Sequence, residues 1–302
     1  MITAFYPADY TATGPKAIFN LFRRNRIRIE HLYCDAVALK SITYERYRGH
    51  INWTSVDRFI SGHRSRILCR KGTQLPAERG YRRFESNELN LRLCENAALF
   101  LLRNSKADHV STALIDDTGE SAGLCAYLAQ ETDRVTVVTK KPRLYLSEAD
   151  RLLEEKGAVI TVSKTDSPLK TADLIIAPAP LTRDLHCAED AVILSANVPT
   201  VAQKAPVISG YSIELPEKYS AVKPDYLDDM YFASAMYALA GAHELGSSIF
   251  RRCTDGVTIH TRQSLIELLK RRLEQAPVGS GSYPGALTAG LPQQRKAPNL
   301  SA

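Results

Sequence analysis

The sequence has little of what marks secreted, membrane or metal-binding proteins. Its six cysteines stand singly, without the paired short spacings of a zinc site or the density of a disulfide framework. No uninterrupted apolar run approaches ~18 residues, so no membrane helix is predicted. Residues 1–10 contain no basic segment followed by an apolar run, so no signal peptide is expected. We therefore expect a cytoplasmic protein with reduced thiols, no metal site and no membrane partner.

Catalytic sequence motifs are also lacking. There is no G-x-S-x-G nucleophile elbow, no phosphate-binding P-loop and no pair of histidines at metal-ligand spacing. His186 and Cys187 are adjacent, but a single His beside a single Cys is far more often packing or surface than a catalytic pair. No catalytic residue is predicted, and nothing in the sequence specifies an oligomeric state.

The composition is that of an ordinary globular protein, with 44% apolar and 24% charged residues, and 302 residues suffice for two domains. The net charge of +6 is unevenly distributed: residues 1–85 hold 16 Lys and Arg against 7 Asp and Glu, a net +9, which leaves −3 for the remainder. We expect a small basic α+β domain over residues 1–85, a Rossmann-like α/β domain with helical additions over 86–276, and a disordered tail over 277–302.

The basic N-terminal segment carries its densest charge at residues 23–28, and aromatic residues from Phe19 to Trp53 are interleaved with it. Basic and aromatic side chains interleaved in this pattern can bind single-stranded nucleic acid. They are also typical of a solvated arginine face over a small core, which is the interpretation we favour. Residues 1–15 include Pro7, Gly14 and Pro15 and are expected to form an irregular arm.

After Ala107, apolar β-branched runs alternate with helical segments. Six runs are predicted to be strands: 110–115, 135–138, 158–162, 173–177, 191–195 and part of 207–215. Several of them are apolar without alternation, as strands covered on both faces are. Strands that alternate with helices imply right-handed crossovers. The predicted fold class is therefore α/β, with a doubly wound, mostly parallel Rossmann-like sheet, a smaller basic α+β N-terminal domain and C-terminal helices.

The first of these strands ends in the turn Asp116-Asp117-Thr118-Gly119, which opens a helix. A dinucleotide fingerprint places two glycines and a small residue at positions that correspond here to Asp117, Gly119 and Ala122. Gly119 and Ala122 fit, and the N–H groups around Thr118 at the helix start suit an anion. Asp117 departs from the pattern, because its charge would repel phosphates unless it were neutralised. The alternative is a structural turn in which Asp117 caps the helix.

The second strand ends in Thr139-Lys140-Lys141-Pro142-Arg143, without an acid for the ribose hydroxyls of NAD. Basic residues here suit the 2′-phosphate of NADP, so NADP is the favoured dinucleotide, with Lys140, Lys141 and Arg143 around that phosphate and Thr139 beside them. The alternative is a solvated basic loop.

Asn197 follows the fifth strand, at the edge where open α/β sheets bind small molecules, so a small-molecule ligand is expected. If NADP binds, Asn197 is placed near the nicotinamide. A simple turn explains Asn197 equally well.

Residues 113–119, 135–139, 152–155 and 173–178 carry a resemblance that covers residues 53–245 in organisation. The chain resembles a group of bacterial Rossmann-like proteins that are distantly similar to the NAD(P)-binding domains of shikimate dehydrogenase and glutamyl-tRNA reductase. The catalytic Lys and Asp of shikimate dehydrogenase belong to a substrate domain whose motifs are not found here, so no catalytic residue is carried over. Two functions stay open: an NADP-linked oxidoreductase acting on a small metabolite, and a non-catalytic Rossmann-like ligand-sensing or interaction protein.

Overall fold

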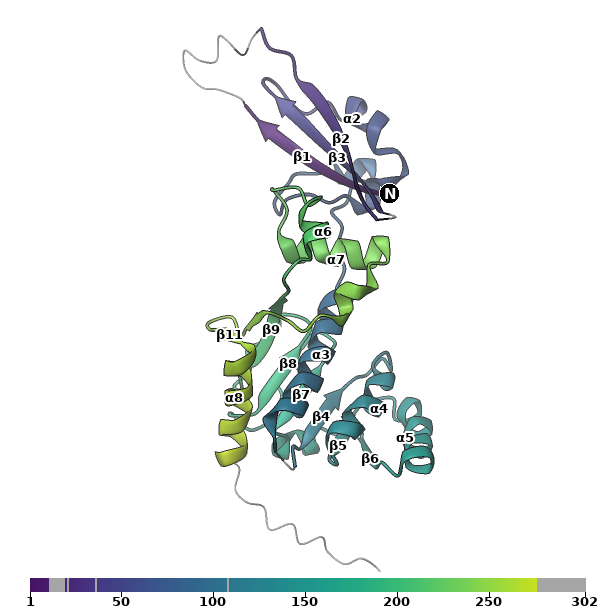
Figure 1. The fold of residues 1–302 in the computed structure, drawn as a ribbon, viewed down its shortest axis with the longest axis vertical. Helices are drawn as coiled ribbons and strands as arrows, with labels where there is room; N and C mark the ends of the chain where they lie inside the picture. The colour runs from purple at the N-terminus through teal and green to yellow at the C-terminus, as the bar shows by residue number, and fades with distance from the viewer. Residues whose placement is uncertain (11–19, 21, 36, 108, 276–302) are drawn as a thin grey trace, which may run out of the picture.

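The computed structural model describes residues 1–10, 20, 22–35, 37–107 and 109–275. A small three-stranded sheet with its helices lies at one end of an elongated molecule, a larger eight-stranded sheet lies at the other, and α7 (Asp229–Ala240) lies between them (Figure 1). The predicted tail over residues 277–302 and Phe19 fall outside the described residues. In the described part of the chain, no helix combines the length and the apolar character that a membrane span requires.

The small sheet has the strand order β1–β3–β2, with β1 (Ile2–Asp9) parallel to β3 (Val37–Arg46) and β2 (Arg26–Cys34) antiparallel to it. One face packs on α2 (Trp53–Ile60), η2 (Ser61–Arg66) and the segment around η3 (Ala77–Arg79). The expected irregular arm over residues 1–15 is therefore wrong for β1. Pro7 is tolerated because β1 is an edge strand, where a missing N–H does not interrupt the sheet.

The large sheet contains six parallel strands in the spatial order β6–β5–β4–β7–β8–β9. Their bounds are β4 (Thr112–Ile115), β5 (Val135–Val138), β6 (Ile160–Ser163), β7 (Leu174–Ala177), β8 (Val192–Ser195) and β9 (Val207–Ser212). Numbered along the chain, this order is 3-2-1-4-5-6, the order of the doubly wound Rossmann sheet. The six predicted strands and the predicted fold class are confirmed.

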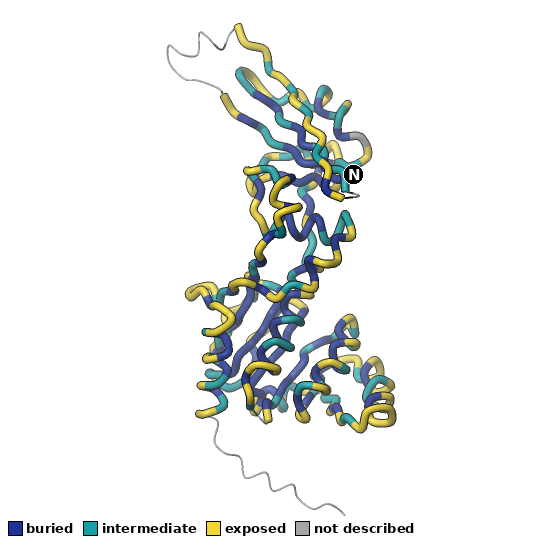
Figure 2. Tube along the Cα trace, viewed as in Figure 1, coloured by how far each residue is buried: buried dark blue, intermediate teal, exposed yellow. Residues whose placement is uncertain are grey.

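Helices cover one face of the large sheet: α3 (Glu88–Ser105), α4 (Ala122–Glu131), α5 (Arg143–Lys156) and α8 (Arg262–Gln275). The opposite face is covered by η4 (Ser167–Thr171) and by irregular segments, from which Leu181 and Leu185 pack on Ile175 and Ile193. Both faces are therefore buried (Figure 2), which is why the strand sequences are apolar without alternation.

A hairpin of β10 (Arg252–Thr254) and β11 (Ile259–Thr261) extends the sheet beyond β9 in antiparallel fashion. This hairpin was not predicted, because strands of three residues are too short to show a period in the sequence. Its turn does carry a recognisable signal, since Asp255 accepts hydrogen bonds from the N–H groups of Val257 and Thr258, and Gly256 has φ +92°.

The two sheets share one continuous core through α7. Asp228 caps this helix by accepting hydrogen bonds from the N–H groups of Met230 and Tyr231. Met236 of α7 belongs to the same buried cluster as Ile2 and Leu39 of the small sheet. The flanking element α6 (Glu217–Ser220) adjoins α7 in Figure 1, and η5 (His243–Ser247), which follows α7, contacts it. The angle between the sheets is thus held by apolar packing.

At the amino ends of the parallel strands, α8 is tied to the sheet by a buried ion pair. Arg272 is 8% exposed, and its Nε lies 3.1 Å from Asp173 Oδ1. Its Nη1 lies 2.7 Å from Asp190 Oδ1, and Asp173 Oδ2 accepts a hydrogen bond of 3.0 Å from the N–H of Ser111. One guanidinium therefore joins α8 to the segments that precede β4, β7 and β8.

Candidate functional site

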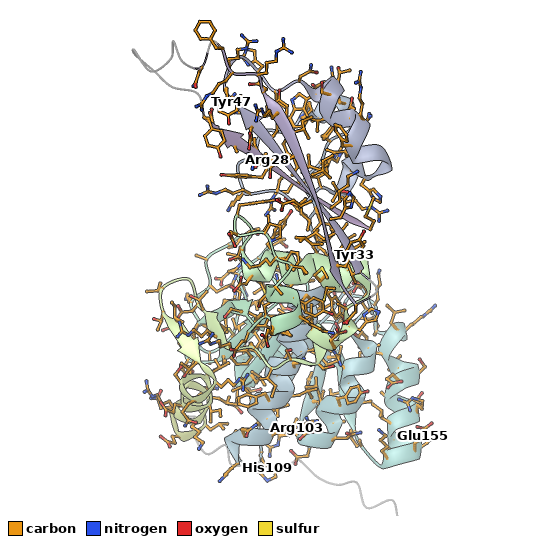
Figure 3. All side chains as sticks on the ribbon, turned by 45° about the horizontal axis from the view of Figure 1, so that its top comes forward. Arg28, Tyr33, Tyr47, Arg103, His109 and Glu155 are labelled. Carbon is orange, nitrogen blue, oxygen red and sulfur yellow. The ribbon has the colours of Figure 1, made fainter. Side chains whose placement is uncertain are left out.

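The basic N-terminal segment includes β2, an edge strand of the small sheet, and Figure 3 shows Arg28 and Tyr47 there. Arg28 Nε lies 2.6 Å from Glu45 Oε1, and the Arg23 guanidinium lies 5.4 Å from the centre of the Tyr47 ring. Tyr47 in turn stacks on Tyr10 at 5.2 Å between ring centres. Arg28 thus pairs with a carboxylate and Arg23 with an aromatic ring of the chain itself, and nucleic-acid binding here stays a prediction.

A cleft of about 610 Å³ opens at the carboxyl ends of β4, β7 and β8. Residues 84–88 and Leu91 form one wall, the turn after β4 forms the floor, and Ala238 and Leu239 of α7 form part of another wall. The strand order reverses between β4 and β7, and open α/β sheets bind their ligands at such a point. The cleft is therefore the candidate functional site.

Asp116 organises the floor of this cleft. Its carboxylate accepts hydrogen bonds from the N–H groups of Thr118 (2.7 Å), Gly119 (3.0 Å) and Ser121 (2.8 Å), and from the Thr118 hydroxyl (2.7 Å). Tyr145 of α5 adds a fifth bond at 2.5 Å, and Asp116 is only 2% exposed. In a dinucleotide-binding Rossmann turn, N–H groups of this kind face the pyrophosphate. In this protein they bind a carboxylate of the chain itself.

The ionisation of Asp116 follows from these contacts. Burial alone would raise its pKa, but the hydrogen bonds from Tyr145, Thr118 and Ser121 outweigh burial, so the pKa lies below its ordinary value. Burial raises the pKa of Tyr145, and its bond to Asp116 raises it further. At neutral pH the turn therefore contains a fixed anion whose hydrogen bonds all come from within the protein.

Two further predicted residues shape the same turn. Gly119 has φ +90°, so its backbone conformation requires glycine, whereas a Cβ there would meet only the end of the exposed Leu144 side chain, 2.7 Å from Cδ1. Ala122 begins α4 and packs against the main hydrophobic core. Ala122 thus has the packing role that the fingerprint assigns to its third position, whether or not a phosphate is bound.

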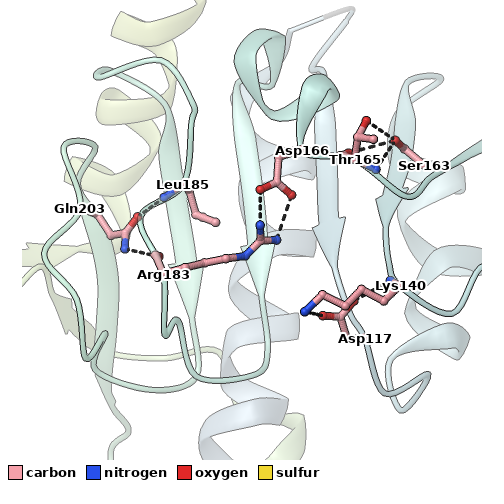
Figure 4. A network of polar contacts seen from close by, with 8 residues as sticks. All are labelled: Asp117, Lys140, Ser163, Thr165, Asp166, Arg183, Leu185 and Gln203. Carbon is pink, nitrogen blue, oxygen red and sulfur yellow. Dashed lines mark hydrogen bonds and ion pairs between the residues drawn. The ribbon is translucent and has the colours of Figure 1, made fainter.

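Asp117 contacts the end of the neighbouring strand instead of the helix N-terminus (Figure 4). Its Oδ1 accepts a hydrogen bond of 2.6 Å from the N–H of Lys140, and its Oδ2 lies 3.5 Å from Lys140 Nζ. The charge of Asp117 is thus neutralised by a lysine. This pair joins the ends of β4 and β5, close to where Rossmann enzymes hold the ribose of a dinucleotide.

The predicted 2′-phosphate residues are exposed and lie together. Lys140, Lys141 and Arg143 line a separate hollow of about 410 Å³, which also includes Lys164 after β6. Thr139 is buried at the end of β5, where its hydroxyl accepts a hydrogen bond of 3.0 Å from the N–H of Lys141.

Beside this hollow, Arg183 extends from the segment after β7 to form a two-bond ion pair with Asp166 (Figure 4). The same segment is held by Gln203, which accepts a hydrogen bond from the N–H of Leu185 and donates one to the carbonyl of Arg183. The loops at the ends of β4 to β8 are thus cross-linked by polar contacts on this side of the sheet.

The predicted site residues consequently divide between two places. Thr118 and Asn197 line the cleft, and Asn197 Nδ2 donates a hydrogen bond of 3.1 Å to the carbonyl of Pro178. The basic residues line the hollow. The role of Asp116 was not predicted from the sequence. A signal for it exists, because an Asp at the end of a strand, here followed by Thr118 two residues later, is typical of an Asx-type turn.

Electrostatically, the cleft is acidic. Its ionisable lining residues are Glu85, Glu88, Asp116 and Glu120, and no lysine or arginine is found among the described residues that line it. A cleft lined by charge of one sign raises the local concentration of ions of the other sign. The cleft therefore favours a cationic ligand over an anionic one.

No protein-family model matches the chain, and the comparison with curated proteins yields no match. Solved structures similar to it include Δ1-pyrroline-2-carboxylate reductase from Thermococcus litoralis in complex with NADH and L-proline, at 12% identity and TM-score 0.28, over 34% of each chain. L-tryptophan dehydrogenase from Nostoc punctiforme is 8% identical, with TM-score 0.30, over 90% of this chain and 80% of that one. A shikimate dehydrogenase in complex with NADP+ is 9% identical, with TM-score 0.30, over 91% and 96%.

The first of these alignments spans only about a third of the reductase, and all three concern the fold alone. All three proteins are named as dehydrogenases or reductases, and two were solved with a nicotinamide dinucleotide. The strand order carries the fold assignment.

Proposed function

We propose that this protein binds a small amine-bearing metabolite in the cleft, on a Rossmann-like scaffold that needs no dinucleotide. The charge of the cleft carries this proposal. Glu88 and Glu120 are exposed at the cleft and offer carboxylates to an ammonium group. A pyrophosphate would instead meet like charges, and the N–H groups of the turn are already bonded to Asp116.

The remaining walls suit a ligand with an apolar body. Leu91, Ala238 and Leu239 contribute hydrocarbon surface, while Ser86 and Asn87 add polar groups close to Glu88. A few polar groups that converge on an apolar wall are the usual composition of a small-molecule site. These features support ligand binding, in a sensing or a catalytic role.

A thermal-shift panel tests this proposal, because a ligand that binds only the folded state raises Tm. The panel contains L-amino acids, polyamines and S-adenosylmethionine, with NAD, NADP and ATP as anionic comparisons. We expect an amine-bearing compound to raise Tm, and we expect Glu88→Gln and Glu120→Gln each to weaken its binding about two- to fivefold.

The matched control is Glu154→Gln, an exposed carboxylate on α5 outside the cleft, which should leave the affinity unchanged. Added salt should weaken binding, because the attraction involves exposed charges. Stabilisation by dinucleotides alone, with no response to any amine, would contradict the proposal.

The basic hollow favours a second candidate, an NADP-linked oxidoreductase acting on a small metabolite. Here Lys140, Lys141 and Arg143 would hold the 2′-phosphate, and Asn197 would lie near the nicotinamide. The observation in favour is that these cations gather with Lys164 around one hollow at the ends of β5 and β6. In this case Thr118, Gly119 and Ala122 would adjoin the pyrophosphate, and Asp116 would have to leave the N–H groups of Thr118, Gly119 and Ser121.

For this candidate, NADP should raise Tm more than NAD does, and Lys140→Glu should lower the affinity for NADP by about tenfold, because it puts a negative charge beside the phosphate. Lys170→Glu on η4 makes the same charge change outside the hollow and serves as the control. The absence of any NADP shift at millimolar concentration would rule the candidate out.

A further inference from the structure

The small sheet has a long free edge at β2. This strand pairs with β3 over nine consecutive residues, in one continuous register, and lies at the border of the sheet. The opposite border, at β1, is partly covered, because the N–H of Phe5 and the carbonyl of Thr3 bond to the main chain of Leu68. No comparable bond to the outer side of β2 is found among the described residues. A regular edge strand of this length, without proline, is a template for pairing with another strand.

Alternate residues of β2 direct their main-chain groups toward this free edge. Two residues connect β2 to β3, so the first cross-strand pair, Cys34 and Val37, is a hydrogen-bonded pair, and the pairs alternate from there. The even-numbered residues of β2 therefore bond to β3. In the part of the chain that the structure describes, nothing pairs with the outward N–H and carbonyl groups, which belong to Ile27, Ile29, His31 and Tyr33.

The charges of β2 make this edge complementary to itself. Arg28 and Glu30 are both exposed, and Glu30 has no ion-pair partner among the described residues. If two copies pair antiparallel about a two-fold axis at Ile29, Arg28 of each copy lies opposite Glu30 of the other. These are non-hydrogen-bonded pairs, in which the side chains come closest. An axis at Arg28 or at Glu30 would instead put like charges opposite each other, so the charges favour one register.

The shape of the molecule permits this arrangement. Asp35, directly after β2, forms an ion pair of 2.8 Å with Lys218 of α6, so the carboxyl end of β2 lies on the side of the large sheet. Arg28 lies farther from the large sheet than Tyr33 does (Figure 3). In an antiparallel pair, the large sheets of the two copies would therefore extend in opposite directions, and neither would obstruct the other.

We propose that two copies of this chain pair through β2, antiparallel about Ile29, and so join their small sheets into one. About six main-chain hydrogen bonds would connect the outward groups of the two strands, and two ion pairs between Arg28 and Glu30 would set the register. The interface is separate from the acidic cleft, none of whose described lining residues belongs to β2.

Sedimentation velocity of the full chain from about 1 to 100 µM tests the proposal, because a dimer of this kind dissociates on dilution. His31→Pro removes an outward N–H and puts a ring at the edge, while the bonds of β2 to β3 stay intact. It should raise the dimer Kd by at least about a hundredfold. His31→Ala is the matched control: it shortens the same exposed side chain but retains the N–H, and should change the Kd by less than about threefold.

Charge changes at Glu30 test the register and do not depend on how well the proline variant folds, because this side chain is exposed. Glu30→Gln should raise the Kd about three- to tenfold, because both ion pairs are lost, and Glu30→Arg should raise it further, because like charges then lie opposite each other. Glu154→Arg makes the same charge change on α5 and should leave the Kd unchanged.

Three results would overturn the proposal. The first is a chain that stays monomeric over the whole concentration range. The second is a His31→Pro variant that dimerises as well as His31→Ala does, since the dimer would then use another surface. The third is a tighter dimer for Glu30→Gln, which pairing about Glu30 itself would produce.

Discussion

Replacing Asp116 with alanine is expected to lower the free energy of unfolding by about 3 kcal/mol at pH 7, because three N–H groups and two hydroxyls lose a buried charged acceptor. Phosphate or pyrophosphate should restore part of this loss by occupying the vacated N–H groups. The measurement is urea unfolding with and without added phosphate. Phosphate should therefore stabilise Asp116→Ala more than it stabilises the unmodified protein, in which the carboxylate of Asp116 already occupies the N–H groups of the turn.

The pH dependence follows from the lowered pKa of Asp116. A carboxyl whose pKa is lower in the folded state contributes stability above its unfolded pKa of about 3.9, and loses it as pH falls through the folded value. The difference between the unmodified protein and Asp116→Ala should therefore be constant near neutral pH and shrink in acid. Asp117→Ala removes a carboxylate of a half-exposed pair and should cost below about 1 kcal/mol. Equal losses for the two variants would contradict the role assigned to Asp116.

Replacing Arg272 with leucine is expected to cost about 3–5 kcal/mol, because Asp173 would remain buried without its cation. Asp190 would lose its partner too, and α8 would lose its polar attachment to the sheet. The measurement is the midpoint of urea unfolding. An unchanged m-value would show that the shift in midpoint reports a change in stability.

The neighbouring Arg271→Leu is the control, since Arg271 is exposed on the same helix and its loss should change stability by less than about 0.5 kcal/mol. Combining Arg272→Leu with Asp173→Asn should recover part of the loss, because the uncompensated charge disappears while an acceptor for the N–H of Ser111 remains. If the double variant is no more stable than Arg272→Leu alone, the burial of an unpaired charge is not the cause.

The strands of the large sheet were predictable because strands buried on both faces are apolar at almost every position. Runs such as Leu174–Ala177 have no polar alternation, and the intervening helices set their spacing. The hairpin at residues 252–261 leaves a weaker mark, because three-residue strands are too short to show a period.

The cleft was predictable only in part. Its floor lies at the end of the first parallel strand, where fold rules place a site, but the direction of each side chain in the turn depends on local geometry. Asp117 aligns with the first glycine position of the fingerprint, from which it departs, whereas Asp116, one residue earlier, is the carboxylate that binds the N–H groups. The opposite wall depends on Leu239, more than a hundred residues away in the chain, which packing alone brings beside β4.

Because Asp116 binds the N–H groups of its own turn, its carboxylate competes for them with any phosphate in solution. A phosphate in solution must reach the N–H groups by diffusion at its cellular concentration, whereas a carboxylate in the same turn has a high effective concentration set by the chain. This advantage does not change with nucleotide supply. The conformation of the turn, and the helix that begins there, should therefore be equally populated in cells rich or poor in dinucleotides.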